Sequence, residues 1–217
     1  MYIKICGLRE ASNIEMISQL KPDFLGFIFY EKSPRYAIGI LSEKQIRALP
    51  SEIVPVGVFV NESEKNILSI IKRFGLRGVQ LHGNESAEFI LNLRKDLGAD
   101  FLIMKAFGIH SGFDFQILES YYPLVQYLLF DTKTEVHGGS GKKFEWDILE
   151  KYTGSLPYFL SGGIGIEDIP NLQSDLGIKP YFKNLVGLDM NSQLEDSPAK
   201  KNILKVKDAI ERIKKLN

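Results

Sequence analysis

The chain has 217 residues, of which 44% are hydrophobic, and its 27 basic residues equal its 27 acidic residues. This balance excludes the clustered basic surface of a general nucleic-acid or membrane-surface protein, and no apolar run approaches the ~20 residues that span a bilayer. A single cysteine excludes an internal disulfide, and the three histidines lack metal-ligand spacing, so we expect a cytoplasmic protein without a bound metal.

Short apolar segments recur along the chain with the length of buried β-strands. Most are continuous rather than alternating, as parallel strands covered on both faces are. They are Ile3–Cys6, Phe24–Phe29, Val54–Val60, Arg77–Leu81, Phe101–Ala106, Tyr127–Asp131, Tyr158–Leu160 and Leu185–Met190. Between them lie segments of helical periodicity, and the last one repeats apolar residues at threes and fours from Ile203 to Ile213.

Local signals predict where several helices begin and end. The segments Asn61–Glu64 and Asn84–Ser86 place capping side chains and acidic residues where helix N-termini favour them. Gly75 and Gly98 are expected C-terminal stops. The lysine-rich run from residue 200 to residue 215 is interpreted as the solvated face of the last helix.

Eight strands that alternate with about eight helical segments predict an α/β fold, a single (β/α)8 TIM barrel over residues 1–217. A doubly wound open sheet is the alternative. However, no GxGxxG follows the first strand, where a dinucleotide-binding fold would place it. No linker or low-complexity stretch divides the chain, so we expect one domain.

The carboxyl ends of the strands carry the chemistry in such barrels, and two of them end in reactive groups. Cys6 ends the first strand, with Lys4 on the same face, where its charge favours the thiolate. An inert buried thiol is the alternative. Asp131 ends the sixth strand across the ring, so the thiol and the carboxyl can exchange protons with one substrate. Alternatively, Asp131 caps the next turn or pairs with Lys133.

A phosphate site is predicted after the seventh and eighth strands. Gly162 and Gly163 let the backbone approach a ligand, and the helix that begins near Ile166 offers amides to an anion. Asn191 and Ser192 complete this site, for which a plain turn is the alternative.

Two further polar residues follow strands. Arg35 is the candidate for a ligand carboxylate, because its guanidinium matches carboxylate geometry, unless its loop is a solvated surface turn. His82 is interpreted as a histidine at the edge of the core rather than as a catalytic residue. The glycine-rich segment Thr134–Gly141 is a candidate lid.

In chain order, the strand ends contain a set of motifs that together are specific. The motifs are Lys4–Leu8, Asp23–Phe29, Ser33–Tyr36, Gly57–Asn61, Val79–Gly83, Leu129–Asp131, Gly138–Gly141, Leu160–Ile164 and Gly187–Ser192. They cover nearly the whole chain, and the chain resembles the phosphoribosylanthranilate isomerase family of tryptophan biosynthesis.

The resemblance implies a (β/α)8 barrel that needs no cofactor or metal. Its reaction is the Amadori rearrangement of N-(5-phosphoribosyl)anthranilate to 1-(2-carboxyphenylamino)-1-deoxyribulose 5-phosphate. By resemblance, Asp131 is the general acid that opens the ribose ring, Cys6 is the base that takes the C2 proton, and Arg35 binds the anthranilate carboxylate. Four residues match the phosphate site of the family: Gly162, Gly163, Asn191 and Ser192. The partner implied is a small phosphorylated substrate, bound by a monomer or a homodimer.

The chain departs from the family pattern near its end. Gln193 stands where glycine is usual, and a positive φ there would cost roughly 1 kcal/mol. Ala199 and Asn202 replace the glycine and the aspartate of a Pro-Gly-x-Lys-Asp pattern. We expect these two positions to affect the entry to the last helix more than the chemistry.

Two other functions remain as alternatives. One is isomerisation of a phosphoribosyl imidazole intermediate, which generally uses paired aspartates, so Cys6 counts against it. The other is a non-catalytic ligand-binding barrel. The presence of Cys6, Asp131 and Arg35 together counts against that alternative.

Overall fold

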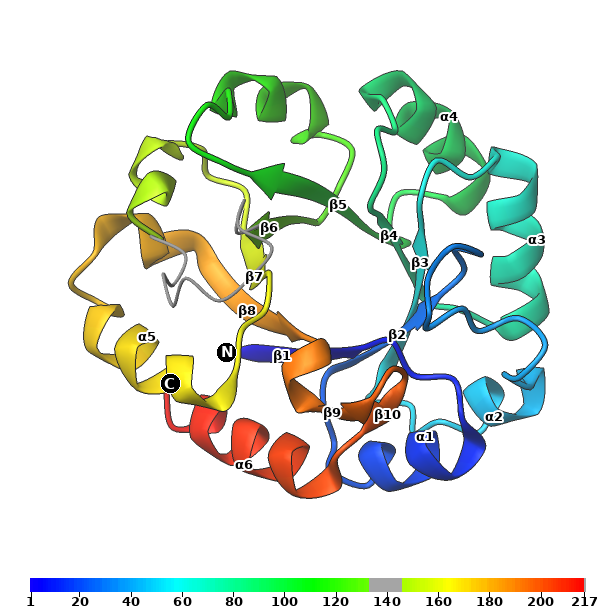
Figure 1. Ribbon diagram of the computed structural model, residues 1–217. Helices are drawn as coiled ribbons and strands as arrows, with labels where there is room; N and C mark the ends of the chain where they lie inside the picture. The colour runs from blue at the N-terminus through cyan, green and yellow to red at the C-terminus, as the bar shows by residue number, and fades with distance from the viewer. Residues whose placement is uncertain (133–145, 217) are drawn as a thin grey trace.

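The computed structural model describes residues 1–132 and 146–216. Eight parallel strands close a ring in chain order, because β1 pairs with β2 on one side and with β8 on the other (Figure 1). The strands of the ring are β1 Tyr2–Cys6, β2 Phe24–Ile28, β3 Val54–Phe59, β4 Gly78–Leu81, β5 Leu102–Ile109, β6 Tyr127–Thr132, β7 Tyr158–Ser161 and β8 Leu185–Met190. The predicted TIM barrel is confirmed, whereas the expected lid Thr134–Gly141 lies outside the described residues.

Helices cover the outside of the ring (Figure 1). They are α1 Ala11–Ser18, α2 Glu43–Arg47, α3 Glu64–Phe74, α4 Ala87–Leu97, α5 Ile169–Asp175 and α6 Ile203–Lys214. About eight helical segments were expected, and two of the connections between strands contain 3₁₀ turns, at Phe115–Tyr121 and Trp146–Lys151. Pro123 follows the first of these turns and β6 begins at Tyr127, so the chain has no room there for a longer helix.

The predicted helix caps are confirmed for α3 and α4. Ser63 accepts a hydrogen bond from the amide of Asn66 at 3.3 Å, and Ser86 accepts one from the amide of Phe89 at 3.1 Å. Gly75 ends α3 in the left-handed conformation, with φ of 69°. These local signals depend on backbone groups a few residues away, so the sequence alone predicts them.

Large side chains fill the barrel interior toward the amino ends of the strands. Phe159 of β7 lies at the centre, with its ring 5.5 Å from that of Phe24 and 5.2 Å from that of Tyr127. Val56, Met104 and other buried residues complete this cluster. The packed layer closes the amino end of the barrel interior and leaves the carboxyl ends of the strands for a site.

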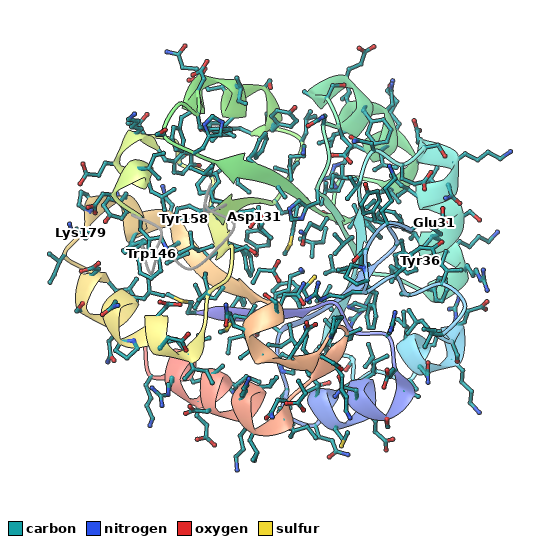
Figure 2. The ribbon with its side chains drawn as sticks, in the orientation of Figure 1. Glu31, Tyr36, Asp131, Trp146, Tyr158 and Lys179 are labelled. Carbon is teal, nitrogen blue, oxygen red and sulfur yellow. The ribbon has the colours of Figure 1, made fainter. Side chains whose placement is uncertain are left out.

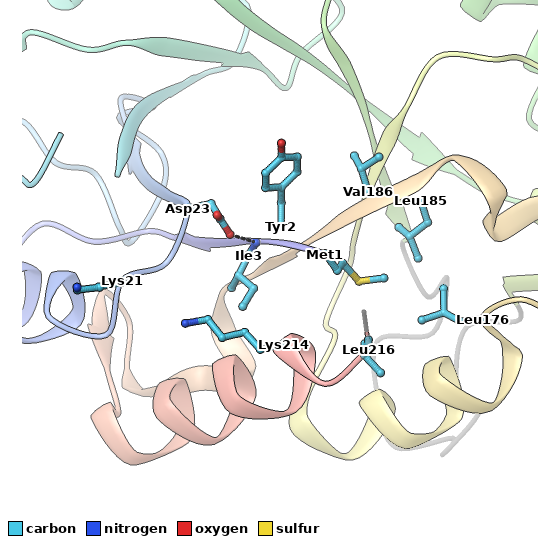
Figure 3. Close-up of a pocket in the computed structure, with 10 residues that line it drawn as sticks. All are labelled: Met1, Tyr2, Ile3, Lys21, Asp23, Leu176, Leu185, Val186, Lys214 and Leu216. Atoms are coloured by element: carbon cyan, nitrogen blue, oxygen red, sulfur yellow. Dashed lines mark hydrogen bonds between the residues drawn. The ribbon is translucent and has the colours of Figure 1, made fainter. Parts of the chain in front are cut away.

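A cavity of about 620 Å³ lies outside this layer, at the amino end of the barrel (Figure 3). Tyr2, Val186 and Lys214 are among its lining residues, and Asp23 Oδ2 accepts a hydrogen bond from the amide of Ile3 at 2.8 Å. It contains none of the predicted site residues. Among the described residues, no helix is both long and apolar enough to cross a membrane.

The segment after β8 resolves the expectation about Gln193. Gln193 lies in a 3₁₀ turn, Ser192–Leu194, and the non-glycine residues with positive φ in the described parts of the chain are Lys21, Asn61 and Ala199. Position 193 therefore does not need a glycine. Ala199 does occupy a left-handed position, with φ of 68°, which costs an L-residue roughly 1–2 kcal/mol.

Asn202, which stands where the family pattern has an aspartate, is the N-cap of the last helix. Its side chain accepts a hydrogen bond from the amide of Lys205 at 3.0 Å, at the start of α6, and donates one to Asp196 Oδ1 at 2.8 Å. The departure at this position therefore keeps the cap of the last helix.

We expect Asn202→Ala to lower the free energy of unfolding by about 1 kcal/mol, because it removes the acceptor for an α6 amide. Asn202→Asp keeps that acceptor and should stay within a few tenths of a kcal/mol of the parent protein. Urea denaturation measures both variants. Equal stability of Asn202→Ala and the parent would show that the cap does not stabilise α6.

Candidate active site

Cys6 lies at the carboxyl end of β1, buried beside a lysine. It pairs with Gly26 of β2, where an added Cβ would lie 2.7 Å from Sγ and 3.1 Å from Lys4 Nζ. The missing side chain at Gly26 thus makes room for the thiol and the ammonium together. Lys4 Nζ donates a hydrogen bond to Asp189 Oδ1 of β8 at 2.9 Å, and both side chains are buried. The expectation that Lys4 and Cys6 share a face is confirmed.

Burial and the neighbouring charges have opposing effects on the pKa of the Cys6 thiol. Burial raises the pKa of the Cys6 thiol above its ordinary value; Lys4 opposes this shift and Asp189 adds to it. Burial lowers the pKa of Lys4, but Asp189 and Cys6 outweigh burial and raise it overall, so Lys4 keeps its charge. The effect of Lys4 on the thiol pKa has the expected direction, whereas the opposing effect of burial was not evident from the sequence.

Arg35 reaches the same end of the barrel from the loop after β2. Its Nε donates to Glu195 Oε1 at 2.8 Å and its Nη2 donates to Glu195 Oε2 at 2.6 Å, which is a bidentate pair. A Cβ on Gly7 would lie 2.7 Å from Arg35 Cδ, so the glycine after Cys6 lets the arginine pass close to β1. Arg35 is therefore not in a solvated surface turn. One edge of its guanidinium holds Glu195, and the other edge can receive a ligand carboxylate.

Lys201 fixes Glu195 from the other side. Its Nζ donates to Glu195 Oε1 at 2.7 Å and to Asn191 Oδ1 at 2.6 Å. The left-handed backbone at Ala199 turns its amide toward Glu195 Oε1, at 3.1 Å. The backbone at position 199 thus contributes to the site as well as to the entry to the last helix. Burial lowers the pKa of Lys201, although Glu195 opposes the shift.

The interpretation of the lysine-rich end as one solvated helix face is wrong at its start. Lys200 and Lys201 form a short strand, β10, which pairs with β9, Glu195–Ser197, ahead of α6. Lys201 is only 2% exposed. The burial of Lys201 could not be predicted, because the lysines here have nearly helical spacing and the hairpin that buries Lys201 has no local sequence signal.

Asp131 is half-buried at the end of β6, and His82 is its partner. Figure 2 shows Asp131 toward the middle of the ring, whereas Lys179 lies at its outer edge. His82 Nε2 lies 3.1 Å from Asp131 Oδ2, and Gln80 Nε2 lies 2.7 Å from His82 Nδ1. The interpretation of His82 as a core-edge histidine missed this contact, since it joins strands β4 and β6, which are not neighbours.

The loop after β4 is anchored by a buried ion pair. Lys105 Nζ lies 3.2 Å from Glu85 Oε2 and donates to the carbonyl oxygen of Gly83 at 2.7 Å. Glu85 also accepts hydrogen bonds from the amides of Asn61 and Gly83, at 2.8 and 2.9 Å. This network joins the ends of β3, β4 and β5 and holds the backbone that carries His82.

The predicted phosphate residues lie after β7 and β8, as expected. Gly162 and Gly163 adopt positive φ angles of 101° and 76°. The amide of Gly165, at the start of the next helical turn, donates to Asp168 Oδ2 at 2.9 Å, so this part of the expected anion cradle already has a carboxylate partner. Ser192 is exposed, whereas Asn191 directs its Oδ1 to Lys201.

The structure gathers some predicted residues and separates others. Cys6, Arg35 and Asn191 converge around Gly7, where an added Cβ would meet both Arg35 Cδ and Asn191 Oδ1 within 2.8 Å. Asp131 is separated from β1 by β7 and β8, across the mouth of the barrel. Among the described residues, no cluster of His, Cys, Asp and Glu is placed to hold a metal ion.

The comparisons with known proteins agree on one family. The family model described as N-(5'phosphoribosyl)anthranilate (PRA) isomerase matches residues 3–212. A relative named N-(5'-phosphoribosyl)anthranilate isomerase, from Parabacteroides distasonis, is 40% identical and covers 98% of this chain and 93% of its own length.

Solved structures give the same result for the fold. Phosphoribosyl anthranilate isomerase from Thermotoga maritima is 30% identical, with a TM-score of 0.77 over 99% of both chains. A second structure of the Thermotoga maritima protein is named as that of a dimeric enzyme. A complex of PRAI with reduced 1-(o-carboxyphenylamino)-1-deoxyribulose 5-phosphate is 27% identical, with a TM-score of 0.76 over 99% of both chains.

We expect Lys4→Met to raise the pKa of the Cys6 thiol further, because it removes the cation that favours the thiolate. Asp189→Asn should have the opposite effect, since it removes the carboxylate that opposes ionisation. Cys6 is the only cysteine, so the ultraviolet absorbance of the thiolate reports this group alone, with Cys6→Ser as the blank.

Both variants break a buried ion pair, which costs about 3–5 kcal/mol, so a thermal melt must first show that each is folded. A thiol pKa that stays the same in folded Lys4→Met would remove Lys4 from the control of Cys6.

Proposed function

Because the chain belongs to the N-(5'-phosphoribosyl)anthranilate isomerase family, we propose that Cys6 and Asp131 are the base and the acid of its reaction. The chain is an isomerase that acts on N-(5'-phosphoribosyl)anthranilate in tryptophan biosynthesis. The observation that carries the function is the match of the family model over residues 3–212, which includes every candidate site residue.

The reaction begins with a proton from Asp131. The carboxyl gives its proton to the ring oxygen of the ribose, the bond between that oxygen and C1 breaks, and the nitrogen lone pair forms a protonated Schiff base with C1. Cys6, as thiolate, then removes the C2 proton, and the electron pair moves to form the enolamine and neutralise the nitrogen. Asp131 is now ionised and Cys6 is protonated.

Formation of the ketone restores both groups. The enolamine loses the proton of its C2 hydroxyl to the Asp131 carboxylate and gains a proton at C1 from the Cys6 thiol. All protons are then accounted for, and no metal or nucleotide enters the balance. Asp131 and Cys6 suit this exchange because β6 and β1 lie across the mouth of the barrel, on either side of a substrate.

The Lys4–Asp189 pair supports the role of Cys6 as a base. A thiol in a fully apolar pocket would hold its proton too tightly to act, because burial disfavours the thiolate. Lys4 places a fixed positive charge beside Sγ, and Asp189 keeps that charge in place at 2.9 Å. The thiolate from which the cycle starts, and to which it returns, is therefore compensated.

Arg35 and the glycines after β7 account for the two anionic ends of the substrate. We assign the anthranilate carboxylate to the free edge of the Arg35 guanidinium, which Glu195 holds in one orientation. The phosphate is assigned to the backbone around Gly162 and Gly163 and to Ser192, with Asn191 as part of its support.

Several broader expectations stay predictions. They are a cytoplasmic location, a chain that forms one catalytic domain over residues 1–217, and a monomeric or homodimeric state. The alternative of a phosphoribosyl imidazole isomerase has no supporting observation, since the group at the end of β1 is a thiol rather than a carboxylate.

We expect Cys6→Ala and Asp131→Asn each to lower kcat by about 10²- to 10⁴-fold with little change in KM, because each removes one proton-transfer group. The loss of anthranilate fluorescence of the substrate measures turnover, without added metal or nucleotide. Asp96→Asn, at an exposed aspartate of α4, is the matched control. A near-parental rate in either site variant would refute the role of that residue, and no turnover by folded parent protein would refute the function.

We expect Arg35→Met to raise KM by about 10- to 100-fold, the effect of one hydrogen bond to a charged group, and to change kcat less. Arg73→Met, which removes an exposed ion pair with Glu43, is the control and should leave KM unchanged. Steady-state kinetics over a range of substrate concentrations separates the two constants. An unchanged KM in Arg35→Met would exclude this arginine from substrate binding.

A further inference from the structure

His82 forms a chain of side chains that ends at the proposed acid. Gln80 Nε2 lies 2.7 Å from His82 Nδ1, and His82 Nε2 lies 3.1 Å from Asp131 Oδ2. Gln80 is 1% exposed, so its amide is fixed within the barrel wall. Gln80 therefore fixes the imidazole through Nδ1, and the opposite ring nitrogen, Nε2, faces one oxygen of the Asp131 carboxyl.

The other ionisable groups near His82 have partners of their own. The ionisable groups that line the same cavity are Glu85, Lys105, His110 and Tyr121. Glu85 and Lys105 are paired with each other, and the Tyr121 hydroxyl donates to the Glu85 carbonyl oxygen at 3.1 Å. His110 Nδ1 accepts a hydrogen bond from the amide of Gly112. Among the described residues, Asp131 is the charged group in contact with the His82 ring.

The cavity gives both groups access to water. It has a volume of about 480 Å³ and is lined by His82 and Asp131 together with aromatic residues. His82 is 31% exposed and Asp131 is 19% exposed. Water in this cavity can therefore exchange protons with the imidazole.

The proposed mechanism demands a protonated acid near neutral pH. Aspartic acids in water are ionised there, whereas the imidazole is the side chain whose ordinary titration range spans pH 5 to 8. An imidazolium beside a carboxylate holds one shared proton, equivalent to a neutral imidazole beside a carboxylic acid. The contact between Nε2 and Oδ2 is the path between the two forms.

We propose that His82, oriented by Gln80, shares the catalytic proton with Asp131 and supplies it as the ribose ring opens. The inference rests on the proposed role of Asp131. The Nε2 proton moves to Oδ2 and from there to the ring oxygen, which leaves a neutral imidazole beside the Asp131 carboxylate. When Asp131 later takes the C2 hydroxyl proton, that proton returns to Nε2, so the pair is restored.

Gln80 can form a hydrogen bond with either protonation state of His82 Nδ1, depending on the orientation of its amide. Its Oε1 is buried and has no hydrogen-bond partner among the described residues. In the present orientation Nε2 can donate to an unprotonated Nδ1, whereas a half-turn of the amide would place Oε1 opposite Nδ1, where it accepts a hydrogen bond from a protonated Nδ1. Gln80 can therefore hold the ring in either protonation state of Nδ1.

The test is the pH profile of kcat in His82→Gln. This variant keeps a side-chain amide near Asp131 but cannot carry the proton, so we expect kcat at pH 7.5 to fall about 10- to 100-fold. The fall should diminish as the pH is lowered, because Asp131 then holds a proton unaided, and KM should change less than about twofold. His110→Gln, which replaces the other histidine of the cavity, is the matched control with the parental profile.

Gln80→Glu tests the same inference in the opposite direction. A carboxylate at Nδ1 stabilises the imidazolium, so the alkaline limb of the kcat profile should move to higher pH. Parental pH profiles in folded His82→Gln and Gln80→Glu would overturn the inference, even if Asp131→Asn is inactive. Full activity of Asp131→Asn would instead refute the proposed function on which the inference rests.

Discussion

The pairing of β1 with both β2 and β8 is the constraint on which the site depends. Closure of the barrel sets Cys6 opposite Gly26 on one side and Lys4 opposite Asp189 on the other, although residues 4 and 189 stand at opposite ends of the chain. The thiol thereby gains room from a glycine and a neighbouring charge from an ion pair. An open sheet would leave β1 or β8 at an edge, and the same residues would lie far apart.

Buried lysines recur around the carboxyl end of the barrel, each with its own carboxylate. Lys4 pairs with Asp189 beside Cys6, Lys201 pairs with Glu195 beside Arg35, and Lys105 pairs with Glu85 beneath the loop of His82. Burial of a charge costs free energy, and such pairs are weak sources of stability. Their common position indicates that they serve orientation, since each one fixes a group or a loop that faces the mouth of the barrel.

The proposed acid and the proposed base occupy different environments, and this difference suits the roles that we propose for them. The Cys6 thiol is buried and titrates above its ordinary range, with a fixed cation nearby that limits the shift. Asp131 is partly exposed and contacts an imidazole that water can reach. The proposed base is thus shielded from solvent, whereas the proposed acid is accessible to water.

The sequence by itself determined the order of strands and helices, the caps at Ser63 and Ser86, and the position of Cys6, Arg35 and Asp131 at strand ends. These features follow from periodicity and from contacts a few residues long, and the family motifs lie in the same local segments. The partners of those residues, such as His82 and Lys201, were decided only by the tertiary structure. Burial and the closure of the ring set which distant side chains meet, and therefore in which direction the pKa of the thiol shifts and which groups hold Asp131 and Arg35 in place.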